Sequence, residues 1–103
     1  MTYLSNAFSL QMISGDVTVN VKSVDATEVA EAEFVSCVGH LDTANVVSTL
    51  LGGKEVKCNR VSITLNKGDI LYVAQVTGGR LPEGATTLPE GFEIVFKRVE
   101  ILE

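Results

Sequence analysis

Residues 34–51 read FVSCVGHLDTANVVSTLL, and this stretch decides the fold class of the chain. The apolar run at 34–38 predicts a strand, since short apolar runs bounded by turn residues are typical of buried strands. Gly39 and His40 break the run, and a helix is predicted from residue 41 or 42 to residue 51. The apolar stripe of that helix consists of Val46, Val47, Leu50 and Leu51. A strand, a tight turn and a helix N-terminus are therefore expected in direct succession.

Further strands are predicted on both sides of this unit. Their expected ranges are 2–5, 17–22, 60–65, 70–76 and 92–102, and a second helix is expected at 26–33. The turn sequence Asn66-Lys67-Gly68-Asp69 predicts that 60–65 and 70–76 form an antiparallel hairpin. The order strand, helix, strand from 34 to 65 predicts a parallel crossover. We therefore expect one α/β domain over residues 1–103, with a mixed sheet of about five or six strands flanked by helices mainly on one face.

Composition excludes several classes of protein. The chain has 103 residues, of which 46% are hydrophobic, so one core of ordinary size is expected. No apolar run approaches the roughly 20 residues that cross a bilayer. The first six residues lack the basic and apolar regions of a signal peptide. We therefore expect a cytoplasmic protein with no membrane partner, in which Cys37 and Cys58 are reduced.

The formal net charge of -5 argues against binding to long nucleic acids, which requires a broad basic surface. A short anionic ligand remains compatible with it, because a helix N-terminus offers free N–H groups and the positive end of the helix dipole. His40, the single histidine, lies at the predicted N-terminus of the helix at 41–51 and can transfer a proton near neutral pH. The alternative is a half-buried histidine that only fills a corner of the fold.

Four groups of polar residues lie at the boundaries of predicted elements. They are Asn6 with Ser9, His40 with Asp42 and Thr43, Asn59 with Arg60, and Arg80 with Glu83. Each group alone is explained by helix capping, a polar strand start or a surface ion pair. Together they supply a proton donor, two guanidinium groups and a carboxylate, which suits phosphate binding with proton transfer.

The sequence contains no acidic cluster, no paired cysteines and no glycine-lysine phosphate loop, so we expect no metal and no cofactor. Without a metal to activate water, the most accessible nucleophile for phosphodiester cleavage is a substrate 2′-OH. That route leaves a 2′,3′-cyclic phosphate. The protein then has to orient the in-line attack and protonate the leaving 5′-oxygen.

Three motifs resemble the viral ring nucleases of type III CRISPR defence, small anti-CRISPR proteins of archaeal viruses and phages with relatives in bacterial genomes. The motifs are Asn6-Ala7-Phe8-Ser9-Leu10-Gln11-Met12, Val38-Gly39-His40-Leu41-Asp42-Thr43-Ala44 and Asn59-Arg60-Val61. The resemblance runs in the same order from residue 3 to about residue 84. Some relatives carry a helix before the last strand, for which residues 85–91 are too short.

The resemblance implies a homodimer that binds cyclic tetra-adenylate across its interface. It also implies metal-independent cleavage of the ring to linear di-adenylate with 2′,3′-cyclic phosphate ends, which switches off type III CRISPR signalling. By position, His40 corresponds to the catalytic general acid and Glu83 to an assisting acidic residue. The positions that correspond to substrate-binding residues are Asn6, Ser9, Arg80, Asn59 and Arg60.

Two other functions fit the same residues. The chain can be a non-catalytic dimer that binds a cyclic nucleotide, in which case the same site serves without turnover. It can also be a protein-interaction module whose function depends on an exposed apolar patch. In that last case Arg80 and Glu83 are expected to be dispensable.

Overall fold

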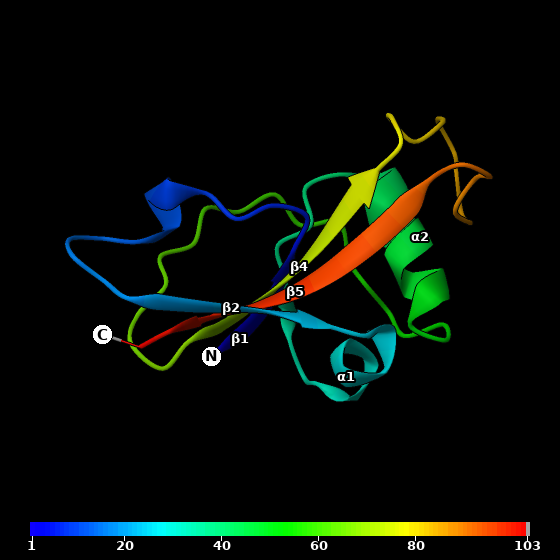
Figure 1. The fold of residues 1–103 in the computed structure, drawn as a ribbon. Helices are drawn as coiled ribbons and strands as arrows, with labels where there is room; N and C mark the ends of the chain where they lie inside the picture. Colours follow the sequence, from blue (N-terminus) through cyan, green and yellow to red (C-terminus); the bar gives the residue numbers. More distant parts are fainter. Residues whose placement is uncertain (103) are drawn as a thin grey trace.

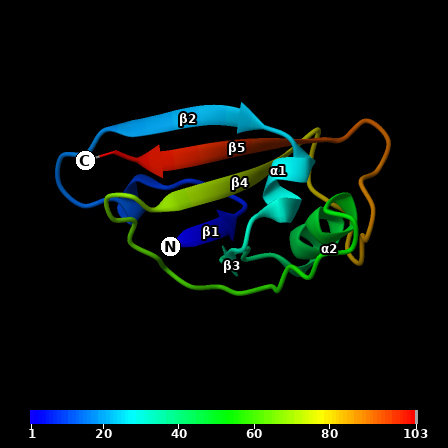
Figure 2. The same cartoon turned by 90° about the horizontal axis from the view of Figure 1, so that it is seen from below.

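The nearly continuous apolar run after residue 69 forms the central strand β4, Ile70–Thr77, as the sequence predicts. A computed structural model of the protein describes residues 1–102. Its other elements are β1 (Thr2–Ser5), η1 (Leu10–Met12), β2 (Val19–Val24), α1 (Ala26–Glu31), β3 (Val35–Ser36), α2 (Leu41–Leu50) and β5 (Glu93–Ile101). The strands form one five-stranded sheet in the order β2-β5-β4-β1-β3 (Figure 2).

The sheet is mixed, as expected. β1 runs parallel to both β3 and β4, whereas β5 pairs antiparallel with β4 and with β2. The radius of gyration is 13.3 Å, the value expected for one domain of about 100 residues. These observations confirm a single α/β domain with a five-stranded mixed sheet and two α-helices.

Both α-helices cover the same face of the sheet (Figures 1 and 2). Side chains alternate along β4, so that Tyr72 and Ala74 face the helices while Leu71 and Val73 face the other side. The core between sheet and helices contains Leu4, Val29, Val38, Ala44, Val47, Leu51, Val56, Tyr72, Ala74 and Phe96. The prediction of helices mainly on one face is therefore confirmed.

The opposite face is covered by η1 and by an irregular segment, residues 60–65. This segment was expected to be a strand, and that prediction is wrong. Ile63 and Leu65 pack against the sheet while Ser62 and Thr64 are exposed, which produces the alternation. The Leu65 N–H donates to the Met12 carbonyl (2.6 Å) rather than to a neighbouring strand. The antiparallel partners of β4 are therefore found in β5, and the predicted hairpin does not exist.

The strand expected at 34–38 is short, because only Val35–Ser36 forms a ladder with β1. Beyond it, the Cys37 N–H donates to the Leu4 carbonyl (2.7 Å), and Val38 makes a single parallel bridge to Cys58. Cys37 is buried, which raises the pKa of its thiol, and Cys58 is exposed.

No helix in residues 1–102 combines the length and the apolar character that a membrane crossing requires.

One polar contact ties α1 to the middle of the sheet. Asp25 caps the helix by accepting the Glu28 N–H (2.9 Å). The Glu28 carboxylate in turn accepts hydrogen bonds from the Tyr72 hydroxyl and from Arg98, each at 3.0 Å. Burial, followed by the neighbouring Glu28 carboxylate, raises the pKa of Tyr72. Tyr72 is therefore held in its neutral form as a hydrogen-bond donor.

Replacing Tyr72 with phenylalanine should lower the free energy of unfolding at neutral pH by about 0.5–1.5 kcal/mol, the contribution of one hydrogen bond. A raised folded-state pKa contributes stability that is present below the unfolded pKa and is lost as pH rises through the folded value. The difference between wild type and Tyr72→Phe, measured by urea unfolding, should therefore shrink above about pH 10. Tyr3→Phe, on the other face, is the matched control. A difference that stays constant into the alkaline range would contradict this account.

Candidate functional site

The carboxyl ends of the three parallel strands meet at one edge of the sheet. β1 is followed by Asn6, β3 leads to Gly39 and His40, and β4 leads to Arg80. In open α/β sheets, ligands bind outside this edge, because loops and helix N-termini converge there. Parallel pairing therefore brings residues from three distant parts of the sequence to one place.

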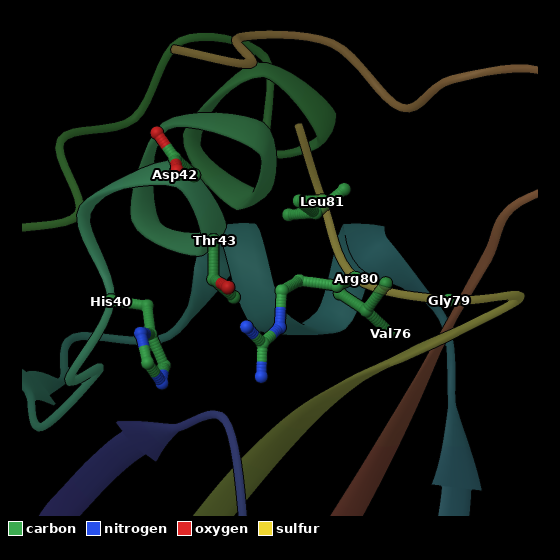
Figure 3. Close-up of a pocket in the computed structure, with 7 residues that line it drawn as sticks. All are labelled: His40, Asp42, Thr43, Val76, Gly79, Arg80 and Leu81. Atoms are coloured by element: carbon green, nitrogen blue, oxygen red, sulfur yellow. The ribbon is translucent and has the colours of Figure 1, made fainter. Parts of the chain in front are cut away.

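A pocket of about 390 Å³ opens at this edge (Figure 3). The start of α2, the end of β4 and the loop after β4 line it with His40, Asp42, Thr43, Val76, Gly79, Arg80 and Leu81. Its volume is in the range of small-molecule sites. Figure 3 shows the His40 ring and the Arg80 guanidinium extending to the same side, with Thr43 between them, whereas Asp42 points away. The structure thus brings two of the predicted site residues together.

His40 is the N-cap residue of α2, and its backbone is extended (φ -127, ψ 127). Its carbonyl accepts the Ala44 N–H (3.0 Å), which closes the first helical turn. The imidazole makes no capping hydrogen bond and is exposed. His40 is therefore not a half-buried packing residue, and its ring is available to a ligand at the positive end of the helix dipole.

Gly39, the residue before His40, makes a hydrogen bond with each of its two backbone polar groups. The Gly39 N–H donates to Asn6 Oδ1 (3.3 Å), and the Gly39 carbonyl accepts from Arg60 Nε (2.8 Å). The Arg60 stem also packs closely on this residue, since a Cβ at position 39 would lie 3.3 Å from Arg60 Cγ. Two more of the predicted site residues, Asn6 and Arg60, therefore fix the backbone that presents His40.

Arg80 is presented by the strap, which we define as residues 78–92 between β4 and β5. Gly78 and Gly79 have φ values of 104 and 136, which side-chain-bearing residues rarely adopt. A Cβ on Gly78 would lie 2.7 Å from the Gly91 carbonyl oxygen, so the two ends of the strap meet in a narrow neck. This neck lets the chain turn so that Arg80 lies beside His40.

The other predicted site residues do not line the pocket. Glu83 is exposed on the strap. Ser9 caps η1 by accepting the Gln11 N–H (3.2 Å), and Asn59 Nδ2 donates to the Ser36 carbonyl (2.9 Å) at the sheet edge. A ligand contact by these three residues stays a prediction.

Thr43 also lines the pocket, although the sequence predicted no specific ligand-binding role for it. It is 9% exposed, and it lines the pocket between His40 and Arg80. The signal in the sequence is its position three residues after His40, which places both at the start of one helix. Within residues 1–102, no group of three or more His, Cys, Asp or Glu side chains is arranged to hold a metal ion.

Comparison with known proteins places this geometry in context. A sequence profile described as STIV B116-like matches residues 2–97. Among solved structures, B116 of Sulfolobus turreted icosahedral virus (STIV) is similar, with 26% sequence identity and a TM-score of 0.79. The similarity covers 96% of this chain and 97% of that one. No curated protein matches the chain.

Gly78→Ala should disturb the neck of the strap, because the added Cβ meets backbone atoms that cannot move independently of β5. We expect thermal unfolding to show a loss of roughly 1–3 kcal/mol for the strained backbone, with a further loss from the clash. Gly68→Ala is the matched control, since Gly68 has φ 88 but nothing within 4 Å of the added atom. Equal losses in the two variants would show that the neck is not tightly packed.

Proposed function

The chain belongs to the STIV B116-like family, and from this membership together with the site we propose that it is a ring nuclease. We propose that it cleaves cyclic tetra-adenylate, without metal, to linear di-adenylate with 2′,3′-cyclic phosphate ends, and so switches off type III CRISPR signalling. The observation that carries the proposal is that His40 and Arg80 line one pocket at the N-terminus of α2. His40 lies in one of the sequence motifs that resemble the ring nucleases.

In the proposed reaction, a substrate 2′-oxygen attacks the adjacent phosphorus while the bond from phosphorus to the 5′-oxygen breaks. The 2′-hydroxyl gives its proton to a solvent water, and His40 donates a proton to the 5′-oxygen that leaves phosphorus. Arg80 holds the non-bridging oxygens and offsets the negative charge that accumulates on them. Two such cleavages on opposite sides of the ring yield two di-adenylates.

Local charges support this proposal although the chain is acidic overall. The net charge is -5, but the pocket lies at the positive end of α2 and contains the Arg80 guanidinium. Thr43 adds a hydroxyl at the same place. A phosphodiester therefore meets donors in this pocket rather than the average surface charge.

Asn6 and Arg60 contribute indirectly in this proposal, through the Gly39 peptide that places His40. Glu83 is proposed to assist His40 from the strap, where it lies two residues beyond the pocket residue Leu81. Ser9 and Asn59 are proposed as further substrate-binding positions on the basis of the sequence resemblance alone.

We also propose that the active form is a homodimer. A pocket of about 390 Å³ is suited to one small ligand, and a ring of four nucleotides is larger than that. A twofold dimer would present two copies of the pocket to a ring of matching symmetry. One histidine per chain would then act on each of two phosphodiesters.

His40→Ala should slow cleavage of cyclic tetra-adenylate in the presence of EDTA by roughly 10²–10⁴-fold, the usual contribution of a general acid. His40→Gln, which keeps a polar side chain of similar size, should be equally slow. Arg80→Lys should weaken ring binding because lysine loses the bidentate fork. The cleavage rate is measured under single-turnover conditions, with the products separated by chromatography. Tight binding by wild type without any turnover would support the non-catalytic binder instead.

Sedimentation velocity should show a dimer, and titration with the ring in the His40→Ala background should show one ring per two chains. A monomer that binds one ring per chain would contradict the dimer proposal. The cleavage assay would still test the role of His40.

A further inference from the structure

Two side chains of α2 hold the middle of the strap. Asp42 Oδ1 accepts the Gly84 N–H (3.0 Å), and Thr49 Oγ1 donates to the Thr86 carbonyl (2.6 Å). Asp42 and Thr49 are seven residues apart, which places them on one face of the helix, two turns from each other. We call this pair the latch.

Few other hydrogen bonds hold the strap. Its other hydrogen bonds are internal turns, from the Ala85 N–H to the Pro82 carbonyl and from the Phe92 N–H to the Pro89 carbonyl, each at 3.1 Å. Within residues 1–102, the latch supplies the only hydrogen bonds that join residues 78–92 to another part of the chain. Between Gly78 and Gly91, the hydrogen bonds that hold the strap to the rest of the described residues therefore all come from α2.

Arg80 in turn depends on the strap. Its guanidinium makes no hydrogen bond or ion pair with the described residues, and its side chain is exposed. Its location beside His40 is therefore determined by the backbone between the neck and Gly84. We propose that Asp42 and Thr49 are positioning residues, which latch the strap to α2 and thereby hold Arg80 at the pocket. The consequence for ligand affinity rests on the proposed function of Arg80.

The positioning role of Asp42 can be distinguished from the direct effect of its negative charge on ligand binding. Asp42 lies at the rim of a pocket proposed to bind phosphate, so its carboxylate disfavours an anion there. Removing the charge alone should strengthen ring binding. Loss of the latch should weaken binding, because Arg80 is no longer held in place. The two effects have opposite signs.

Thr49 offers the cleaner variant, since it carries no charge and does not line the pocket. Thr49→Val removes the hydroxyl at nearly constant size, and Thr49→Ser keeps the hydroxyl. For Asp42, Asp42→Ala removes the acceptor, whereas Asp42→Asn keeps an acceptor oxygen without the charge. Thermal melts of all four variants control for global folding.

The latch itself is tested on the free protein, without any ligand. Thr49→Val and Asp42→Ala should each speed hydrogen exchange at the Gly84 amide by roughly three- to tenfold, the factor that one hydrogen bond represents. They should also speed tryptic cleavage after Arg80, followed by mass spectrometry. Thr49→Ser and Asp42→Asn should stay near wild type. Unchanged exchange and cleavage in Thr49→Val and Asp42→Ala would overturn the latch, whatever the protein does to cyclic tetra-adenylate.

The link to the site is tested by titrating cyclic tetra-adenylate into the same variants in a His40→Ala background. Thr49→Val should weaken binding by roughly three- to tenfold. Asp42→Ala should bind more weakly than Asp42→Asn by a similar factor, because both variants lack the charge and only Asp42→Asn keeps the acceptor oxygen. Unchanged or stronger binding in Thr49→Val, alongside weaker binding in Arg80→Ala, would overturn the positioning role. If Arg80→Ala leaves binding unchanged, the failure belongs to the proposed function of Arg80, and the exchange and tryptic data still decide the latch.

Discussion

The parallel pairing of β1 with strands on both sides is the constraint on which the site depends. Because β3, β1 and β4 run in one direction, the segments that leave them emerge at one edge of the sheet. The Gly39 peptide lies there, held by Asn6 from the end of β1 and by Arg60 from the segment after α2. The same edge receives the strap, and with it Arg80. A change in strand direction would separate all of these groups.

The sequence predicts those elements whose residue pattern depends only on the element itself. The apolar run of β4 and the amphipathic spacing of α2 are local properties, and both elements were confirmed. Residues 60–65 show the limit of such reasoning. Ile63 and Leu65 both pack against the sheet, but their alternation does not indicate which backbone segment pairs with theirs. Pairing between β4 and β5 depends on residues more than a dozen positions apart in sequence, across the strap.

The site was predictable in its chemistry and less so in its arrangement. His40 and Arg80 were expected to act together, and the pocket brings them together. The resemblance implied an assisting role for Glu83 without placing it relative to His40, and its side chain is exposed on the strap. The hydrogen bonds on Gly39 join residues 6, 39 and 60, so no local pattern could reveal them. The spacing of Thr43 from His40 places both at the start of α2. The residues of β4 and of the strap that share the pocket with Thr43 lie far from it in the sequence.

The chemistry proposed for this pocket requires a ribose hydroxyl as the nucleophile and His40 as the acid for the leaving oxygen. The most direct measurement compares cyclic tetra-adenylate with the matching ring of 2′-deoxyadenylates, each incubated with the protein and EDTA. The account predicts that the ribose ring is converted to di-adenylate with 2′,3′-cyclic phosphate ends, while the deoxy ring stays intact. Persistence of the ribose ring, or cleavage of the deoxy ring, would contradict it.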